Sequence, residues 1–254
     1  MTSENPPSQD PPYLDAQEKS FFKKEIHHLF NRISSSYDLM NDIMSGGLHR
    51  VWKDIFVKRV APQAGEIFLD LAGGTGDITQ RLLKKTQQNS DLFVADLNFK
   101  MIYLGRSRLI DQGLIKNIYW TVACAEDLPF PNDSFDKITI SFGLRNVSDR
   151  RKSLEEIYRV LKPNGTFFCL EFSHPSFPIL RKAYQCYSTF IPLMGDFIAQ
   201  DRAAYQYLVD SIQRFPLQEA LQKEFEEMGF LSCSFENLTG GIVAIHQGTK
   251  EYFS

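Results

Sequence analysis

Short apolar runs alternate with amphipathic segments along most of the chain. Runs at 67–71, 92–95, 118–122, 135–140 and 166–172 predict five strands. The segments between them have helical spacing, as at 154–161, where apolar residues are three, four and seven positions apart. Two more strands are predicted at 232–237 and 242–246, after a helix that ends at Gly229. The alternation predicts an α/β fold with a seven-stranded sheet and helices on both faces.

Helical patterns also flank this α/β region. An apolar stripe predicts a packing or lid helix at the start, although its basic residues leave a membrane-surface role open. The segment 178–199 is predicted to be a helical cover over the substrate side, and Gly165 a left-handed helix stop. The segment 37–52 has no clean period, which fits a pocket wall or an irregular connector equally well. The stripe consists of Phe22, Ile26, Leu29, Phe30 and Ile33, and its basic residues are Lys23, Lys24, His27 and His28.

Composition limits the number of domains and the classes of partner. A chain of 254 residues that is 43% hydrophobic is long enough for one large domain, expected at 21–254 with a helical lid at about 21–60. The proline-rich residues 1–20 predict a disordered tail rather than a signal peptide. A net charge of −3 gives no electrostatic case for a nucleic-acid partner. Four cysteines without metal-ligand spacing predict reduced cytoplasmic thiols and no metal site.

The strand at 67–71 ends in a glycine-rich turn. Gly74 and Gly76 have no Cβ, so the backbone there can adopt positive φ and lie against a ligand at a helix start. The third glycine of the dinucleotide fingerprint is missing, because Thr79 occupies its place. Asp70, at the strand end, would repel a pyrophosphate but attract a sulfonium and an ammonium group. The turn therefore predicts S-adenosylmethionine (SAM) as the cofactor, with a turn that binds nothing as the alternative.

Two further segments extend this cofactor site. Asp96 closes the next strand, where its carboxylate can accept both hydroxyls of a ribose. The loop 123–130 follows the third strand, and such strand-end loops face the crevice of a doubly wound sheet, so it is positioned to touch adenine. The pattern Asp70-x-Ala72-x-Gly74-x-Gly76 resembles motif I of the class I methyltransferases.

Two long stretches carry a sharper resemblance. Tyr37-Asp38-Leu39-Met40-Asn41, followed by Ser45, His49 and Trp52, resembles the N-terminal signature of the ubiquinone/menaquinone biosynthesis C-methyltransferases of the UbiE type. The stretch 159–165, continuing through Glu171-Phe172-Ser173, resembles the second signature of that family. The similarity extends from about residue 30 to residue 250, including 141–147 and 237–244.

The resemblance implies a mostly parallel seven-stranded, Rossmann-like sheet with the last strand reversed. It also implies methyl transfer from SAM to a ring carbon of a prenylated benzoquinol or naphthoquinol, giving menaquinol from demethylmenaquinol, or methylating 2-polyprenyl-6-methoxybenzoquinol. The cofactor contacts it implies lie in the glycine turn, at the ribose, beside the adenine and after the fourth strand. At Cys124 the family usually has Asn or Asp, so the side-chain hydrogen bond to the adenine amino group is in question. A neighbouring backbone group or Glu126 could supply it, or the affinity is lower. The implied contacts are Thr75, Asp96, Cys124, Ala125 and Ser141.

Carbon methylation needs a ring made nucleophilic by loss of a phenolic proton. Arg145 cannot act as the base, but a guanidinium beside the hydroxyl lowers the pKa of the phenol and can orient a water that removes the proton. We expect Asn146 to hold the ring oxygen or that water. The alternative is that Arg145 pairs with Asp149 or caps the next helix. His49 is the second candidate for the base, and on weaker grounds Tyr37, Asp38 and Asn41 line the same pocket.

Two other functions remain open at this stage. One is an O- or N-methyltransferase acting on another small molecule, although Ser141-Phe142-Gly143-Leu144 is not the Asp/Asn-Pro-Pro-aromatic run of base and exocyclic-amine methyltransferases. The other is a SAM-binding scaffold in a quinone-synthesis complex. Peripheral contact with the inner membrane, a homodimer and the identity of the ring are likewise left open by the sequence.

Overall fold

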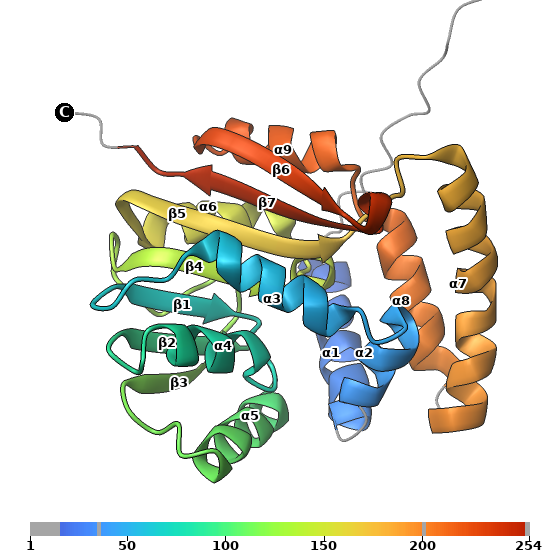
Figure 1. Ribbon diagram of the computed structural model, residues 1–254, viewed down its shortest axis with the longest axis horizontal. Coiled ribbons are helices and arrows are strands. Elements are labelled where there is room, and N and C mark those ends of the chain that lie inside the picture. The colour runs from blue at the N-terminus through green and yellow to red at the C-terminus, as the bar shows by residue number, and fades with distance from the viewer. Residues whose placement is uncertain (1–15, 35–36, 200–201, 252–254) are drawn as a thin grey trace, which may run out of the picture.

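The computed structural model describes residues 16–34, 37–199 and 202–251. Its seven strands form one sheet in the order β3-β2-β1-β4-β5-β7-β6 (Figure 1). Strands β1 to β5 pair in parallel, and β7 runs antiparallel to both β5 and β6. The predicted α/β class, with a mostly parallel sheet and a reversed last strand, is confirmed. The strands are β1 (Ile67–Leu71), β2 (Asp91–Asp96), β3 (Ile118–Val122), β4 (Phe135–Ser141), β5 (Leu161–Phe172), β6 (Leu231–Leu238) and β7 (Val243–Thr249).

Helices cover both faces of this sheet, and each face has its own hydrophobic core. Successive residues of a strand point to opposite faces. Phe68 accordingly packs into the core beneath α3 and α4, whereas Leu69 packs into the core beneath α6 and α9. Burial on both faces explains why these strands are almost continuously apolar in sequence. The covering helices are α3 (His49–Val60), α4 (Asp77–Lys85) and α5 (Phe99–Asp111) on one face, and α6 (Arg150–Val160) and α9 (Gln218–Glu227) on the other.

A further helical layer lies beyond the carboxyl ends of the parallel strands (Figure 1). It contains α1 (Ala16–Ile33), α2 (Tyr37–Ser45), α7 (Pro178–Ala199) and α8 (Arg202–Arg214). The Trp52 indole Nε1 donates to Thr239 Oγ1 at 2.7 Å, which ties α3 to the turn before β7. Tyr187 on α7 donates to the backbone oxygen of Ile43 on α2. Ligands of open α/β sheets bind at the carboxyl ends of the strands, so this layer covers the place where a site is expected.

The helical layer differs from the sequence predictions in three places. Helix α1 begins at Ala16, so residues 16–20 are helical rather than part of a tail, and residues 1–15 lie outside the described segments. The segment 37–52, predicted to be a pocket wall or a connector, forms α2 and the start of α3. Helix α8 was not predicted. The helix predicted at 178–199 is confirmed with the limits expected, and its role as a cover over the substrate stays a prediction.

The predicted left-handed stop at Gly165 is wrong by one residue. Asn164 has φ +62°, whereas Gly165 has no positive φ and lies inside β5. Asparagine tolerates the left-handed region better than most residues, which lets the chain turn one position earlier. Gly165 is needed for space instead, since a Cβ there would lie 2.8 Å from the backbone oxygen of Lys162.

Candidate functional site

The glycine turn after β1 brings three backbone segments unusually close together. Gly74 has φ +54° and Gly76 has φ +75°, as the absence of Cβ atoms permits. A Cβ on Gly73 would lie 2.5 Å from Val94 Cγ1 in β2. A Cβ on Gly143, after β4, would lie 2.5 Å from the Cβ of Ala72. The ends of β1, β2 and β4 therefore form a tight cradle at the carboxyl edge of the sheet.

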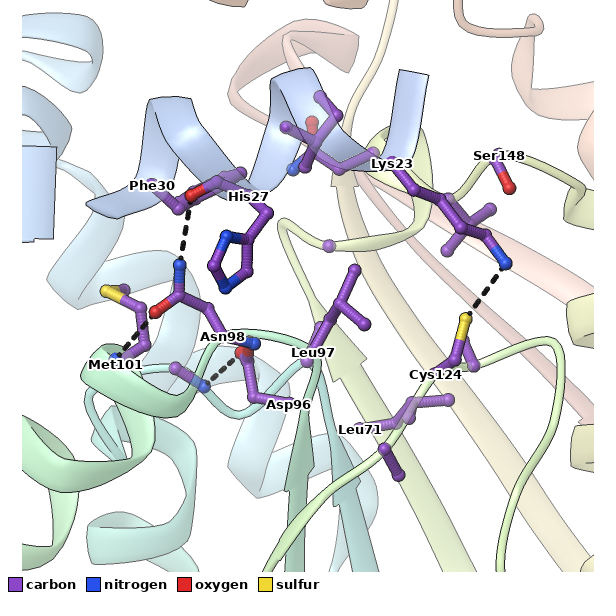
Figure 2. A pocket seen from close by; sticks show the side chains of 18 of the residues that line it. Lys23, His27, Phe30, Leu71, Asp96, Leu97, Asn98, Met101, Cys124 and Ser148 are labelled. Carbon is purple, nitrogen blue, oxygen red and sulfur yellow. Dashed lines mark hydrogen bonds between the residues drawn. The ribbon is translucent and has the colours of Figure 1, made fainter. Parts of the chain in front are cut away.

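A cavity opens over this cradle, beneath α1 (Figure 2). Its walls come from α1, the glycine turn, the end of β2, the loop after β3 and the segment after β4. Five of the residues assigned to the site from the sequence line it, namely Gly74, Asp96, Cys124, Ala125 and Asn146, and so does Glu126, the alternative partner of the adenine amino group. The structure thus brings together residues that are far apart in the chain, and places them where a nucleoside could lie.

Asp96 is one of two acidic residues that line this cavity, the other being Glu126. One of its carboxylate oxygens accepts from the backbone N–H of Gly74 at 2.9 Å, and the other from that of Asn98 at 2.8 Å. Burial raises the pKa of Asp96 to about 6, although both hydrogen bonds act in the opposite direction. Each carboxylate oxygen can accept a second hydrogen bond. The carboxylate therefore suits a ligand with two neighbouring hydroxyl donors, such as a ribose.

Asp70 does not face the cavity, in contrast to the expectation that it would attract a cationic cofactor. Its side chain is fully buried and accepts from the backbone N–H and the hydroxyl of Thr79, at 3.0 and 2.6 Å, and from the Thr139 hydroxyl at 3.0 Å. Burial raises the pKa of Asp70 to about 6. The carboxylate holds the first turn of α4 against the sheet, so its contribution to the site is to fix the shape of the glycine turn.

Thr75 and Ser141 lie beside the cavity without lining it. Thr75 is buried in the turn, with 8% of its surface exposed. The Ser141 hydroxyl oxygen is buried and has no hydrogen-bond partner among the described residues. A buried hydroxyl without a partner is costly, so a ligand atom or a water at the end of β4 would satisfy it. Their assignment as cofactor contacts stays a prediction.

Arg145 is buried at the end of β4 and forms an ion pair with Glu171 of β5. Its Nη1 donates to Glu171 Oε1 at 2.6 Å and to the backbone oxygen of Phe142 at 2.7 Å, and only 3% of its side chain is exposed. Its Nε has no partner among the described residues. Arg145 does not pair with Asp149, which instead binds Lys19 and caps α6.

Asn146 directly follows Arg145 and, unlike Arg145, lines the cavity. Its Oδ1 accepts from the hydroxyl of Tyr207 on α8 at 3.1 Å. Burial raises the pKa of Tyr207 to about 12, so the phenol stays protonated and remains a donor. Phe142 also lines the cavity and packs against Phe172, with ring centroids 4.8 Å apart. The segment after β4 thus presents an amide, an aromatic face and a buried guanidinium together.

His49 does not line this cavity, and its assignment as a candidate base stays a prediction. Its Nε2 lies 3.0 Å from Asp42 Oδ1, and the ring lines a separate polar hollow with Arg50 and Asp77. Burial, with a smaller contribution from the nearby ammonium of Lys53, lowers the pKa of His49. Asn41 is also buried away from the cavity lining, and the side chains of residues 37 and 38 lie outside the described part of the chain.

Several residues of the site were not assigned to it from the sequence. Lys23 and His27 on α1 line the cavity, although their basic character only suggested a membrane role. Glu171 and Tyr207 had no assigned function. The apolar stripe predicted which face of α1 is buried. It could not show that Lys23 and His27 would lie against the ends of the strands. The remaining lining residues are Ile26, Phe30, Leu71, Ala72, Leu97, Asn98, Met101, Ala123, Glu126, Phe142, Gly143, Val147 and Ser148.

Solved structures with the same fold include two described as SAM-dependent methyltransferases. One from Thermotoga maritima superimposes with a TM-score of 0.65 at 18% identity, covering 89% of this chain and 100% of its own. Another, from Aquifex aeolicus, has a TM-score of 0.61 at 14% identity, covering 84% of this chain and 97% of its own. At such identities the likeness shows the fold alone. The fold is that of the class I SAM-dependent methyltransferases.

The sequence comparisons narrow this class to one family. The model of the ubiE/COQ5 methyltransferase family matches residues 17–250, and the chain belongs to that family. The ubiquinone/menaquinone biosynthesis C-methyltransferase UbiE of Marinomonas sp. is 46% identical over 228 residues, which cover 89% of this chain and 91% of the relative. The enzyme of the same name from Coxiella burnetii is 44% identical over 227 residues, which cover 89% of this chain and 91% of that relative. The cofactor is therefore S-adenosylmethionine.

Proposed function

We propose that this enzyme transfers the methyl group of SAM to a ring carbon of a prenylated quinol in respiratory quinone biosynthesis. The observation that carries the proposal is the identity of 46% over 89% of the chain to an enzyme named for this reaction. The relatives are named for both ubiquinone and menaquinone biosynthesis. Demethylmenaquinol and 2-polyprenyl-6-methoxybenzoquinol are therefore both substrates of the proposed reaction.

The segment after β4 supplies the chemistry that a quinol ring needs. SAM provides the electrophilic methyl group, and the protein must make the ring carbon nucleophilic. The Arg145 guanidinium favours the ionised form of a phenol placed beside it, which lowers the pKa of that phenol and lets a water accept its proton. Phe142 lines the cavity, and Phe172 packs against it with ring centroids 4.8 Å apart, so this part of the wall is aromatic. We assign Arg145 to charge stabilisation and Asn146 to holding the ring oxygen or the water.

The Tyr207 hydroxyl orients Asn146 in this proposal. Replacing Tyr207 by Phe removes one hydrogen bond to the Asn146 amide oxygen, so the amide is free to rotate away from the ring. We expect kcat to fall about 5- to 10-fold, corresponding to one hydrogen bond of about 1 kcal/mol, with little change in SAM affinity. Steady-state kinetics with quinol and SAM varied separately measures both quantities.

The matched control is Tyr103→Phe. Tyr103 is an exposed tyrosine on α5 that does not line the cavity, so the loss of its hydroxyl should leave kcat unchanged. If Tyr207→Phe turned over quinol as fast as the unmodified enzyme, Tyr207 would have no positioning role.

The function itself is tested by incubating the purified enzyme with SAM and each demethylated quinol and measuring release of S-adenosylhomocysteine (SAH). We expect SAH release that requires a quinol and yields one methylated quinol per SAH. Release that requires instead an amine, or a phenol lacking a free ring carbon, would support an N- or O-methyltransferase. SAM binding without any transfer to either quinol would support the scaffold function.

We further propose that the start of α7 touches the membrane that holds the prenyl tail. Within the described segments, no helix combines the length and apolar character needed to cross a bilayer. Phe177 and Ile179 are nevertheless 65% and 87% exposed, and the exposed Arg181 and Lys182 follow within one turn. Exposed apolar side chains beside basic ones fit the surface of an anionic bilayer.

Replacing Ile179 by Asp should weaken binding to vesicles of mixed neutral and anionic phospholipid. Loss of one apolar anchor and gain of one negative charge should lower the partition coefficient about tenfold, as measured by co-sedimentation. Leu217→Asp is the matched control, because Leu217 is 51% exposed at the start of α9. Equal losses in both variants, or none in either, would argue against a membrane contact at α7.

A further inference from the structure

Lys23 of α1 reaches into the cofactor cavity and contacts the loop after β3, 101 residues away in the chain (Figure 2). Its Nζ donates to Cys124 Sγ at 3.2 Å and lies 3.6 Å from a carboxylate oxygen of Glu126. All three residues line the cavity. The Lys23 ammonium is thus a hydrogen-bond donor beside two acceptors, Cys124 and Glu126, at the place where the adenine of the cofactor is expected.

Glu126 is held rigidly, with only 6% of its side chain exposed. One oxygen accepts from the backbone N–H groups of Ser148 and Asp149, at 3.0 and 3.2 Å, and also from the Ser148 hydroxyl. The other oxygen accepts from Cys124 Sγ at 2.5 Å. The contacts to residues 148 and 149 position the carboxylate before any ligand binds, so the acceptor side of the group is preorganised.

The edge of an adenine has the complementary pattern. Its amino group is a donor, and it lies between two ring nitrogens, N1 and N7, that accept hydrogen bonds. A thiol is a weak acceptor, so Cys124 alone would hold the amino group poorly. Glu126 supplies a strong acceptor beside it, and the Lys23 ammonium supplies a donor for a ring nitrogen next to the amino group.

We propose that Lys23 is a cofactor-binding residue, which together with Glu126 recognises the edge of the adenine and so makes α1 part of the SAM site. The proposal rests on SAM being the cofactor and is independent of the quinol. It also includes Cys124, because the thiol accepts from the ammonium and donates to the carboxylate.

A purely mechanical role for Lys23 makes a different prediction. Lys19, one turn earlier on α1, forms an ion pair with Asp149 at 2.7 Å but does not line the cavity. If Lys23 only held α1 in place, loss of the Lys19 ion pair should weaken cofactor binding by a comparable factor. The Lys19→Met variant therefore separates docking of α1 from contact with the adenine.

The test is calorimetric titration of the full chain with SAH, in the absence of quinol. We expect Lys23→Met to weaken SAH binding about tenfold, the value of one hydrogen bond from a charged donor, and Lys23→Arg to retain most of the affinity. Lys19→Met and Lys24→Met, whose lysine is exposed on the same helix, should stay within about twofold of the unmodified protein.

Analogues of SAH locate the contact on the adenine. The 1-deaza and 7-deaza analogues each replace one ring nitrogen by a C–H group, so the unmodified protein should bind one of them about tenfold less tightly than SAH. The Lys23→Met variant should bind that analogue and SAH equally well. Unchanged or tighter SAH binding by Lys23→Met, an equal loss in Lys19→Met, or persistent discrimination by Lys23→Met would each overturn the proposal.

Discussion

Replacing Arg145 by Met is expected to lower kcat at least about 100-fold while leaving SAH affinity nearly unchanged. A preorganised cationic group that stabilises charge developing in the transition state typically contributes this much. Arg145 does not line the cofactor cavity, so the loss should appear in turnover and not in cofactor binding. Steady-state turnover of a demethylated quinol and calorimetric titration with SAH measure the two effects separately.

The same substitution should also destabilise the fold, because it leaves the Glu171 carboxylate buried without its partner. Breaking a buried ion pair in this way costs about 3–5 kcal/mol. Burial already raises the pKa of Glu171. An acid whose folded-state pKa is raised lowers the free energy of unfolding at pH values above its unfolded pKa. The deficit of the Arg145→Met variant should therefore shrink as the pH falls from 7.5 towards 5.5, as denaturant unfolding can show.

A double variant separates turnover from stability. Arg145→Met combined with Glu171→Gln removes both charges of the pair, so most of the lost stability should return. Turnover should stay as low as in the single variant, because the guanidinium is still missing. Recovery of turnover in the double variant would show that Arg145 only neutralises Glu171, and the assignment of Arg145 to the chemistry would then be wrong.

Replacing Asp96 by Ala is expected to weaken SAH binding at least about 100-fold. The carboxylate can accept two hydrogen bonds from a ribose, and each hydrogen bond to a charged group contributes about 1.5–3 kcal/mol. Asp96→Asn should lose less, because the amide keeps one acceptor. Asp127→Ala, which removes an exposed carboxylate near the cavity, is the control and should bind SAH normally.

The Asp96 contact should also make cofactor binding depend on pH. Its pKa is raised to about 6, and hydroxyl donors favour the ionised carboxylate, so bound cofactor lowers that pKa. SAH affinity should therefore be constant above pH 7 and fall up to about tenfold per pH unit below pH 6. Titrations of Asp96→Asn should lack this dependence, and a dependence that persisted in the variant would have to come from another group.

The strands were largely predictable from the sequence, whereas the helical layer was predictable only in part. Burial on both faces makes β1 to β5 apolar runs of strand length, so a local pattern is sufficient to find them. Helix α8 also had a local signal, because Ala204, Leu208 and Ile212 are four residues apart and buried on one face. The sequence analysis missed α8 although this pattern was present. It missed α2 because the segment 37–52 has no regular pattern.

The site was predictable where one turn or one strand end defines it. The glycine turn and Asp96 follow directly from the pattern of β1 and β2. The Arg145–Glu171 pair depends on the adjacency of β4 and β5, and the Lys23–Cys124 contact depends on where α1 packs. Such contacts depend on tertiary packing, for which local patterns carry no signal. Asp70 misled for a related reason, since a carboxylate at a strand end can turn towards the helix behind it as easily as towards a ligand.

The most direct test of the proposed reaction is the position of the transferred methyl group. The enzyme would be mixed with a demethylated quinol and SAM labelled with ¹³C in the methyl group, and the extracted quinone examined by carbon NMR. The structure and its relatives predict a single labelled methyl bonded to a ring carbon. A label on oxygen, or SAH formed without any labelled quinone, would contradict the proposed function.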